Sequence, residues 1–450
     1  MRSCATAVAA LLTVISIGYP AAAQQSPLLR LTLDDAMARA MAASHRLAEA
    51  TAREAAAQGG LALRQAASRP TVVTTAGYSR TNHVVEFTVP SPTGAPRVLY
   101  PDVPNNFSSR LELRWAIYTG GRTDALERAA RAEADAAGAD IAVAQADLRL
   151  EVARAYWAVV TARVAADVLE QGVARSQAHV AETERRLLAG LIPPNETASA
   201  RAQEARSRVL AIEARNQRDV SAAELARLIG VDADQSIEPT SELALPTAGL
   251  PSAPSAQASI DASLVAQVRA DRRERRALEY RVLSGDQLRQ AAAAGRRPTI
   301  SLLGGVDYSR PNPRIFPRAD RWDESWDAGV GVSWSLWDGG RTAAEVAQAA
   351  ALTTAARQRL AEFDSVLAVE LWQRSLEMDS AVAAVAAAEV GVAAAAEARR
   401  VVDERYRAGV IGQIEVLDAE FALLQAELDH TRAQAAVRLT EARWARAIGR

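Results

Sequence analysis

The stretch SWSLWDGGRT at residues 333–342 decides how this chain folds, and a near twin, RWAIYTGGRT, occurs at residues 114–123. Alternating apolar side chains predict a β-strand with one apolar face, and paired glycines interrupt strand geometry. We therefore expect each stretch to join a strand to a helix. The residues that form the two junctions are Gly120, Gly121, Arg122, Gly339, Gly340 and Arg341. Thr342 and Glu345 have the spacing of a capping box for the second of these helices.

The two stretches belong to a long internal repeat with an offset of 219 residues. Without gaps, this offset also aligns the following pairs: Trp115 with Trp334, Gly190 with Gly409, and Ile229-Gly230 with Ile448-Gly449. The period is far above that of a solenoid repeat, so it predicts the duplication of a domain-sized unit. We expect the first structural repeat at residues 24–230, a surface linker rich in Pro, Ser and Ala at 231–258, and the second repeat at 259–450.

The N-terminus predicts export from the cytoplasm. Arg2 precedes an apolar run at residues 5–17, and three alanines end at Ala23, which together are typical of a signal peptide spanning residues 1–23. The only cysteine, Cys4, lies inside it, so we expect no disulfide, no thiol nucleophile and no lipidated N-terminus. The Ala/Val stretch at 381–396 is interrupted by Glu389, and we expect no membrane-spanning helix there.

Each repeat predicts the same order of elements. An Ala-rich helix comes first, at 33–67 and at about 260–294, and Thr32 is a plausible N-cap with Asp34 and Asp35 in the first turn. Two strands follow. Residues 124–188 and 343–407 contain no proline and predict two very long helices, and a helix of about 35 residues returns after each.

The predicted strands have one apolar and one polar face. Near residue 110 the apolar set is Phe107, Leu111, Leu113, Trp115 and Ile117, and near residue 330 it is Trp326, Ala328, Val330, Val332, Trp334 and Leu336. Strands of about ten residues with aromatic side chains near their ends are typical of membrane β-barrels. A half-buried soluble sheet has the same alternation, so both interpretations stand at this point. The strand pairs are joined by polar loops at residues 81–106 and 311–324.

Four membrane strands do not close a barrel, and an open sheet edge is not tolerated in lipid. A transmembrane sheet would therefore require several copies of the chain. Two copies give eight strands and an interior filled by side chains, whereas three give twelve strands and a passage. The small residues on the polar face, among them Gly329, Gly331 and Ser333, favour an open lumen.

Enzyme functions find no support in the sequence. The four histidines are scattered and have no metal-ligand spacing, and no P-loop, G-x-S-x-G or H-E-x-x-H motif occurs. We expect no catalytic residue, cofactor or metal. The net charge of −2 gives no electrostatic reason to expect nucleic-acid binding.

The chain resembles the TolC-type outer-membrane efflux protein family. The resemblance is carried by the signal peptide, by LWDGGRT and IYTGGRT at the junctions, by ERYRAGVIGQIEVLDAE at residues 404–420, and by ARAIGR near the end. It implies an α+β membrane protein, a homotrimer whose 12-stranded β-barrel lies in outer-membrane lipid and continues as an α-helical barrel in the periplasm of a Gram-negative bacterium. It also implies a periplasmic adaptor (membrane fusion protein) and an inner-membrane transporter as partners, in tripartite efflux or type I secretion.

The same resemblance implies where the channel is gated. Glu415 and Asp418 match an acidic constriction ring at the periplasmic tip, and Glu196 lies at the corresponding place in the first repeat. Acidic residues in the first turn of a helix are also favoured by its dipole, so a purely structural role stays open for all three. Tyr406 matches an aromatic residue that latches the closed tip through a hydrogen bond to the neighbouring hairpin.

The sequence departs from the family pattern beside this latch. Ile411 replaces a latch arginine and Leu187 replaces an aromatic residue, so we expect a weaker latch or one built around Arg405 or Arg407. Gly190 and Gly409 permit the two tip turns, where the family contacts its adaptor. The competing hypothesis is a periplasmic structural or adhesive coiled-coil protein without a channel. The sequence does not identify the cargo.

Overall fold

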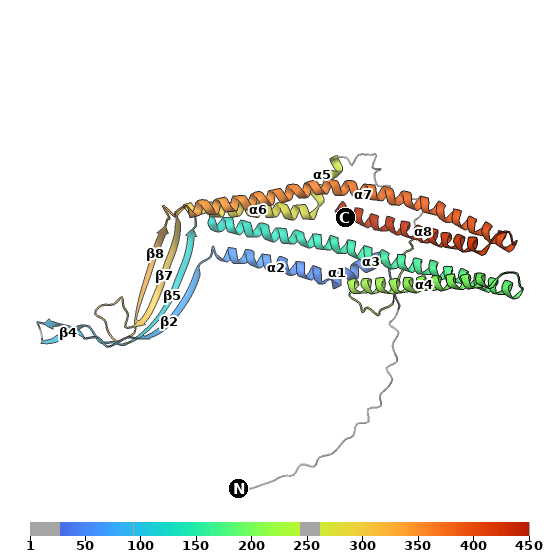
Figure 1. Ribbon diagram of the computed structural model, residues 1–450. Coiled ribbons are helices and arrows are strands. Elements are labelled where there is room, and N and C mark those ends of the chain that lie inside the picture. Colours follow the sequence, from blue (N-terminus) through green and yellow to red (C-terminus); the bar gives the residue numbers. More distant parts are fainter. Residues whose placement is uncertain (1–27, 93, 244–261, 450) are drawn as a thin grey trace, which may run out of the picture.

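The computed structural model describes residues 28–92, 94–243 and 262–449. The predicted signal peptide and the second part of the predicted linker lie outside these residues. The described chain is long and narrow (Figure 1). A β-sheet lies at one end, and long helices run away from it to two helical turns at the other end.

The sheet has four antiparallel strands in the order β2 (Thr71–Arg80), β5 (Asn105–Tyr118), β7 (Thr299–Arg310) and β8 (Asp323–Ser333). The two halves of the chain meet between β5 and β7, where Leu111 pairs with Val306 and Arg110 with Asp307. β2 and β8 each pair with only one strand and form the two edges of the sheet.

The register confirms the predicted faces of the strands, but β8 is shorter than expected. Its last residue is Ser333, which pairs with Thr299, so Trp334 and Leu336 lie beyond the strand. The prediction that they finish the strand was wrong. The partner strand β7 begins only after Pro298, which has no backbone N–H to donate, so no pairing partner remains for Trp334.

The loop predicted at residues 81–106 contains a separate hairpin of β3 (Phe87–Ser91) and β4 (Gly94–Tyr100). Gly94, with φ 129°, stands at the turn. The second arm ends in the consecutive residues Val98, Leu99 and Tyr100, but on the first arm Phe87 and Val89 alternate with Thr88 and Pro90. This is a period-two signal that the proline-rich composition of the segment obscured.

Each of the short helices predicted before the strands is in fact two helices. The first pair is α1 (Leu33–Ala43) and α2 (His45–Ala66), and the second is α5 (Ala262–Asp271) and α6 (Arg273–Ala293), followed by the 3₁₀ turn η1 (Ala294–Arg296). Ser44 breaks the first pair, because its side chain accepts a 3.2 Å hydrogen bond from the N–H of Leu47 and so caps α2. The predicted N-cap Thr32 is confirmed, and it forms a capping box with Asp35.

The long helices α3 (Arg122–Leu188) and α7 (Arg341–Arg407) have 67 residues each, which corresponds to roughly 100 Å of helix at about 1.5 Å per residue. α4 (Pro194–Ile229) and α8 (Gln413–Ala447) return alongside them. Within the described chain, α7 alone has a window of membrane-spanning length and apolarity, and only 11% of that window is buried. The window consists largely of alanine and valine, and α7 packs against α6 and α8.

The main core lies near the middle of the helical part. Leu31, Tyr156 and Leu225 are almost fully buried there, and the phenol of Tyr156 donates a 3.0 Å hydrogen bond to the carbonyl oxygen of Leu31. Two short parallel strands, β1 (Leu29–Leu31) and β6 (Ile237–Pro239), cross this core. The first part of the predicted surface linker is therefore ordered and packed, and Leu243 is 4% exposed.

Candidate functional site

The apolar face of the sheet is exposed. No described helix covers it, and of the described loops only the connection between β7 and β8 packs on one end of it, through Trp322. Its large side chains include Trp326 at 76%, Val332 at 67% and Val72 at 62% exposure. An exposed apolar surface of this kind marks a site that contacts another protein or a membrane. The half-buried soluble sheet considered above would require a covering layer, which the described residues do not provide.

The two strand-to-helix junctions have the same backbone geometry. Gly120 and Gly121 have φ values of 66° and 85°, and Gly339 and Gly340 have 65° and 88°. These are left-handed conformations that glycine adopts without strain. Arg122 and Arg341 are the first residues of α3 and α7.

The cap of α7 differs from the predicted capping box. The carboxylate of Asp338 accepts a 2.9 Å hydrogen bond from the N–H of Thr342, a short one from its hydroxyl, and one of 3.1 Å from the N–H of Gly340. Glu345 instead pairs with Arg341 at 3.1 Å. The expected role of Thr342 and Glu345 was wrong, because Gly340 rather than Thr342 is the N-cap residue.

A tryptophan near each junction makes the same contact. The indole N–H of Trp115 donates to the carbonyl oxygen of Ser68 at 2.9 Å, and that of Trp334 donates to Arg296 at 3.1 Å. Ser68 and Arg296 each precede an Arg-Pro pair that begins a strand. Each tryptophan therefore fixes the chain near its junction to the connection that enters the neighbouring strand.

The first junction is packed, whereas the second is open. A Cβ at Gly120 would lie 2.6 Å from the Cβ of Arg297, whose Nη1 donates a 2.9 Å hydrogen bond to the Gly120 carbonyl oxygen. A Cβ at Gly339 would meet no atom within 4 Å. Arg297 belongs to the second half, so the packed contact joins one half of the chain to the other.

The tip turns also repeat. Gly190 has φ 70° and Gly409 has φ 73°, and each follows a long helix. The N–H of Leu191 bonds to the carbonyl oxygen of Arg186 at 2.9 Å, and the N–H of Val410 bonds to that of Arg405 at 3.0 Å. Both are Schellman motifs. A Schellman motif needs a residue with positive φ at this position, so the end of the helix is by itself a sufficient reason for each glycine.

The predicted acidic residues begin the returning helices. Glu196 lies in the first turn of α4 and Glu415 in that of α8. Glu196 and Asp418 line one groove of about 750 Å³ between the two helix starts. Glu415 is exposed outside this groove. Two of the three acidic residues predicted for the gate are therefore brought together within one chain, and their role in a gate stays a prediction.

Tyr406 joins the two hairpins near the tip. It is 4% exposed, and the guanidinium of Arg186 on α3 lies 4.4 Å from the centre of its ring. Nη1 of Arg186 also donates a 3.2 Å hydrogen bond to the Tyr406 carbonyl oxygen. The sequence suggested Arg405 or Arg407 for a contact of this kind, but Arg407 pairs with Asp403 on its own helix at 2.7 Å.

Buried polar groups that the sequence did not single out surround this contact. His179 of α3 is 9% exposed, and its ring centre lies 5.7 Å from that of Tyr406. Burial lowers the pKa of His179. Burial also raises the pKa of Glu420 on α8, which lies 3.7 Å from Arg399 of α7. Apolar periodicity gives no signal for such contacts, because their partners are far apart in the sequence.

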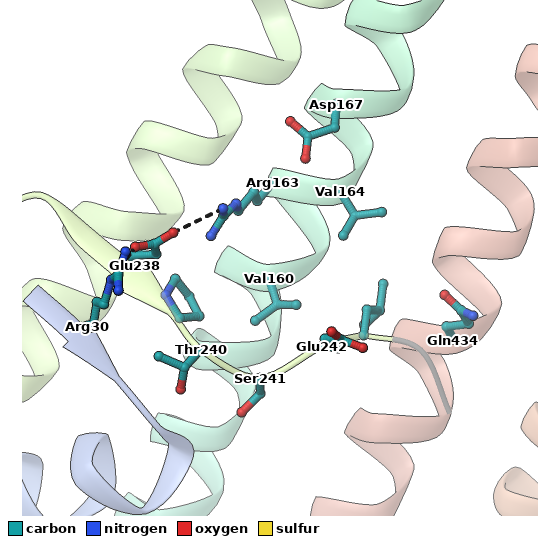
Figure 2. Close-up of a pocket in the computed structure, with 12 residues that line it drawn as sticks. Arg30, Val160, Arg163, Val164, Asp167, Glu238, Thr240, Ser241, Glu242 and Gln434 are labelled. Carbon is teal, nitrogen blue, oxygen red and sulfur yellow. Dashed lines mark hydrogen bonds and ion pairs between the residues drawn. The ribbon is translucent and has the colours of Figure 1, made fainter. Parts of the chain in front are cut away.

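A pocket of about 600 Å³ lies beside the central core, where residues 238–243 cross α3 (Figure 2). Glu238 accepts hydrogen bonds there from Arg30 at 2.9 Å and from Arg163 at 3.2 Å. These ion pairs hold β6 against β1 and α3. Among the described residues, no group of three or more His, Cys, Asp or Glu side chains is arranged to hold a metal ion.

Comparison with protein families matches this chain to the family described as outer membrane efflux protein, over residues 36–231 and 264–450. No curated protein matches the chain by sequence.

Comparison with solved structures finds outer-membrane proteins of the same fold. VceC from Vibrio cholerae is 20% identical with a TM-score of 0.77, and the match covers 93% of this chain and 96% of that one. The CmeC outer membrane channel of Campylobacter jejuni is 16% identical with a TM-score of 0.78, covering 93% and 85%. The MtrE outer membrane channel of Neisseria gonorrhoeae, in its open state, is 20% identical with a TM-score of 0.75, covering 93% and 88%.

Proposed function

Because the chain belongs to the outer membrane efflux protein family, whose members are transport proteins of the outer membrane that extend into the periplasm, we propose that it is the exit duct of a tripartite efflux or type I secretion system. In this proposal cargo passes through it passively, from an inner-membrane pump and a periplasmic adaptor to the exterior. The energy comes from the inner-membrane partner.

The observation that carries the proposal is the exposed apolar face of the sheet. Its strands have 10 to 14 residues, and its large apolar side chains are exposed. Strands of about this length span the hydrocarbon core of a membrane when tilted. The opposite face carries polar and small side chains, such as Ser108, Arg110 and Asp327, and would line the passage.

The edges of the sheet support a ring of several copies. β2 and β8 expose unpaired backbone groups, which lipid does not satisfy. The pairing of β5 with β7 joins the two halves within a chain, and we propose that β8 of one copy pairs with β2 of the next in the same way. Three copies then give twelve strands and an open lumen, whereas two give eight strands and a filled one.

The junctions support the same arrangement. Gly120 contacts Arg297, which stands before the proline that precedes β7, and Arg69 occupies the equivalent place before β2. In a ring, Arg69 of the next copy would occupy the open space beside Gly339. The long helices would continue the wall as a periplasmic tunnel, with Glu415, Asp418 and Glu196 at its narrow end and the turns at Gly190 and Gly409 facing the adaptor.

Detergent extraction followed by planar-bilayer recording tests the proposal. We expect the protein in the outer-membrane fraction, soluble only with detergent, running as a heat-resistant trimer, and conducting ions in a bilayer. A protein that is soluble without detergent, remains monomeric and gives no conductance would refute the duct and favour a periplasmic coiled-coil protein. Co-purification of an adaptor after cross-linking at Ala189→Cys or Ala408→Cys, beside the tip turns, tests the partnership.

A further inference from the structure

Four charged side chains meet on the polar face of the sheet, near the end farthest from the helices. Arg110 of β5 reaches across β7, with Nη1 at 2.5 Å from the carboxylate of Asp307 and Nη2 at 3.1 Å from that of Asp327 on β8. Arg314 lies near the same two carboxylates, at 2.7 Å from Asp327 and 3.7 Å from Asp307. The cluster is therefore balanced, with two cations and two anions.

A glycine makes room for this arrangement. A Cβ at Gly305, which lies beside Asp307 on β7, would be 2.5 Å from Nη2 of Arg110. The guanidinium thus lies directly over the backbone of β7, in space that any other residue would fill. Arg110 connects three strands of the sheet, because its own strand pairs with β7 and β7 pairs with β8.

Arg314 does not belong to a strand. It lies in the connection between β7 and β8, residues 311–322, which we call the strap. Asn312 of the strap is 2% exposed, and its amide donates 3.0 Å hydrogen bonds to the Asp323 carbonyl oxygen and to the Ser325 hydroxyl on the polar face. Ser309, also on this face, is 5% exposed. The first part of the strap therefore folds back over the polar face.

The strap is also fixed at its middle and its end. Arg318 donates a 2.5 Å hydrogen bond to the phenol oxygen of Tyr100 on β4. Trp322 stacks on Tyr308 with ring centres 4.9 Å apart, and Tyr308 belongs to the apolar face. The strap thus begins on the polar face, crosses the rim of the sheet and ends on the apolar face.

We propose that residues 311–322 close the outer end of the passage, and that the cluster of Arg110, Asp307, Asp327 and Arg314 locks them in place and sets the charge of the opening. This inference rests on the proposed function, because it requires the polar face to line a lumen. When the strap leaves, Arg314 leaves with it, and Arg110 remains against two carboxylates. Each copy then adds one net negative charge to the wall, which attracts cations.

Thiol labelling of intact cells tests the strap. Cys4 is the only cysteine in the sequence, so an introduced cysteine provides a single site elsewhere. We would place it at Ser309→Cys, beneath the strap, and add a small, charged, membrane-impermeant thiol reagent from outside. Arg314→Ala should speed the labelling several-fold. The matched control is Arg321→Ala, which removes the same charge from the strap but pairs only with Asp323, at 3.1 Å.

The outcomes separate the strap from the duct. Equal labelling of Ser309→Cys in all three backgrounds would overturn the strap and leave the duct intact. Gly329→Cys on the polar face and Val330→Cys on the apolar face, both in the Arg314→Ala background, test the duct itself, because only the first should react with a water-soluble reagent. Reaction of Val330→Cys as fast as Gly329→Cys would overturn the duct. If Arg314→Ala does not reach the membrane, Arg314→Gln, which keeps a long polar side chain, replaces it.

Discussion

Arg186 of α3 lies over the ring of Tyr406 of α7, 4.4 Å from its centre, and donates a 3.2 Å hydrogen bond to the carbonyl oxygen of the same residue. One side chain thus contacts both the ring and the backbone of a helix 220 residues away in the sequence. Arg186 also donates a 2.9 Å hydrogen bond through Nε to the carboxylate of Glu182 on α3. The two helical hairpins of one chain are therefore joined just before their tip turns.

We expect Arg186→Ala to loosen the tip. A cation–π contact contributes about 0.5–2 kcal/mol and a hydrogen bond about 0.5–1.5 kcal/mol. Since about 1.4 kcal/mol corresponds to a tenfold change in an equilibrium constant, the open fraction should rise at least about fivefold. Single-channel recording in a bilayer measures this as a higher open probability.

Arg185→Ala is the matched control for this prediction. Arg185 is the neighbouring residue, it is 71% exposed, and it also pairs with Glu182, but no contact joins it to Tyr406. Its loss removes the same charge from the same turn. Equal currents in the two variants would contradict a latch at Arg186.

Acidification should open the same contact, because His179 is buried beside Tyr406. Burial is the main cause that lowers the pKa of His179, and Asp403, Arg186, Glu182 and Arg399 surround it with charges that largely oppose one another. A histidine with a lowered pKa stays neutral in the packed state, whereas in a loosened state it takes up a proton below its ordinary value of about 6.5. The packing is therefore fully stable above this pH and weakens as the pH falls below it.

The measurement is open probability at pH 7.5 and at pH 5. We expect a rise at pH 5 in the natural protein and none in His179→Gln, which cannot take up the proton. His430→Gln, which changes a histidine of α8 near Glu389, serves as the control and should keep the rise. An unchanged pH response in His179→Gln would show that another group is responsible.

The exposed acidic pair should set ion preference at the tip. Glu415 and Asp418 lie one turn apart on α8, and Asp418 lines a groove with Glu196 of α4. If three copies place these carboxylates around one axis, Glu415→Ala with Asp418→Ala should raise conductance and reduce cation preference. The shorter alanine side chains leave the passage wider, and fewer negative charges remain to attract cations. The reversal potential in a salt gradient measures the preference.

Glu397→Gln with Glu404→Gln provides the control for the acidic pair. Both residues lie on the last turns of α7, are 60% and 62% exposed, and pair with Arg400. The two substitutions remove two carboxylates near the tip and leave the predicted constriction ring of Glu415 and Asp418 unchanged. Unchanged currents in the Glu415 and Asp418 variant would leave these acidic residues only the structural role of stabilising the helix start through its dipole.

The elements that follow a simple period were predictable from the sequence. Side chains alternate between the two faces of a strand and the long helices lack proline, so the strand faces and the bounds of the 67-residue helices were predicted within a few residues. The pairing of the strands was not predicted, because residue alternation does not say which strands are neighbours. The break at Ser44 was not, because a single serine within an Ala-rich helix acts as a cap only when the chain bends there. Strand β6 was also not predicted, because it forms only through pairing with β1, which is 208 residues away in the sequence.

Site residues were predictable only where all the residues of a feature lie in one short stretch of sequence. The tip glycines and the first-turn acids lie within short stretches of sequence, and the structure places them at the turns and helix starts. Arg186, His179 and Arg399 contact residues on another hairpin, and no local pattern marks such partners. For the same reason the sequence predicted only a polar loop at the strap. The ion pair between Arg314 of the strap and Asp327 of β8 has no local sequence signal.

The two junction glycines should respond differently to substitution. Gly120→Ala forces a left-handed backbone, which costs about 1–2 kcal/mol, and it also clashes with the Cβ of Arg297 inside the same chain. Gly339→Ala carries a similar backbone cost, but its side chain would meet no described atom of its own chain. If Arg69 of the next copy fills that space, Gly339→Ala should mainly reduce the yield of trimer.

Circular dichroism and native electrophoresis after extraction separate these effects. We expect Gly120→Ala to lose folded chain, and Gly339→Ala to keep its helical signal while the trimer band weakens. Gly391→Ala, within α7 and with open space around it, should behave as the natural protein or gain about 0.5–1 kcal/mol of stability, since alanine favours a helix over glycine. A full trimer yield in Gly339→Ala would place the neighbouring copy elsewhere and exclude the pairing of β8 with β2 through an equivalent junction.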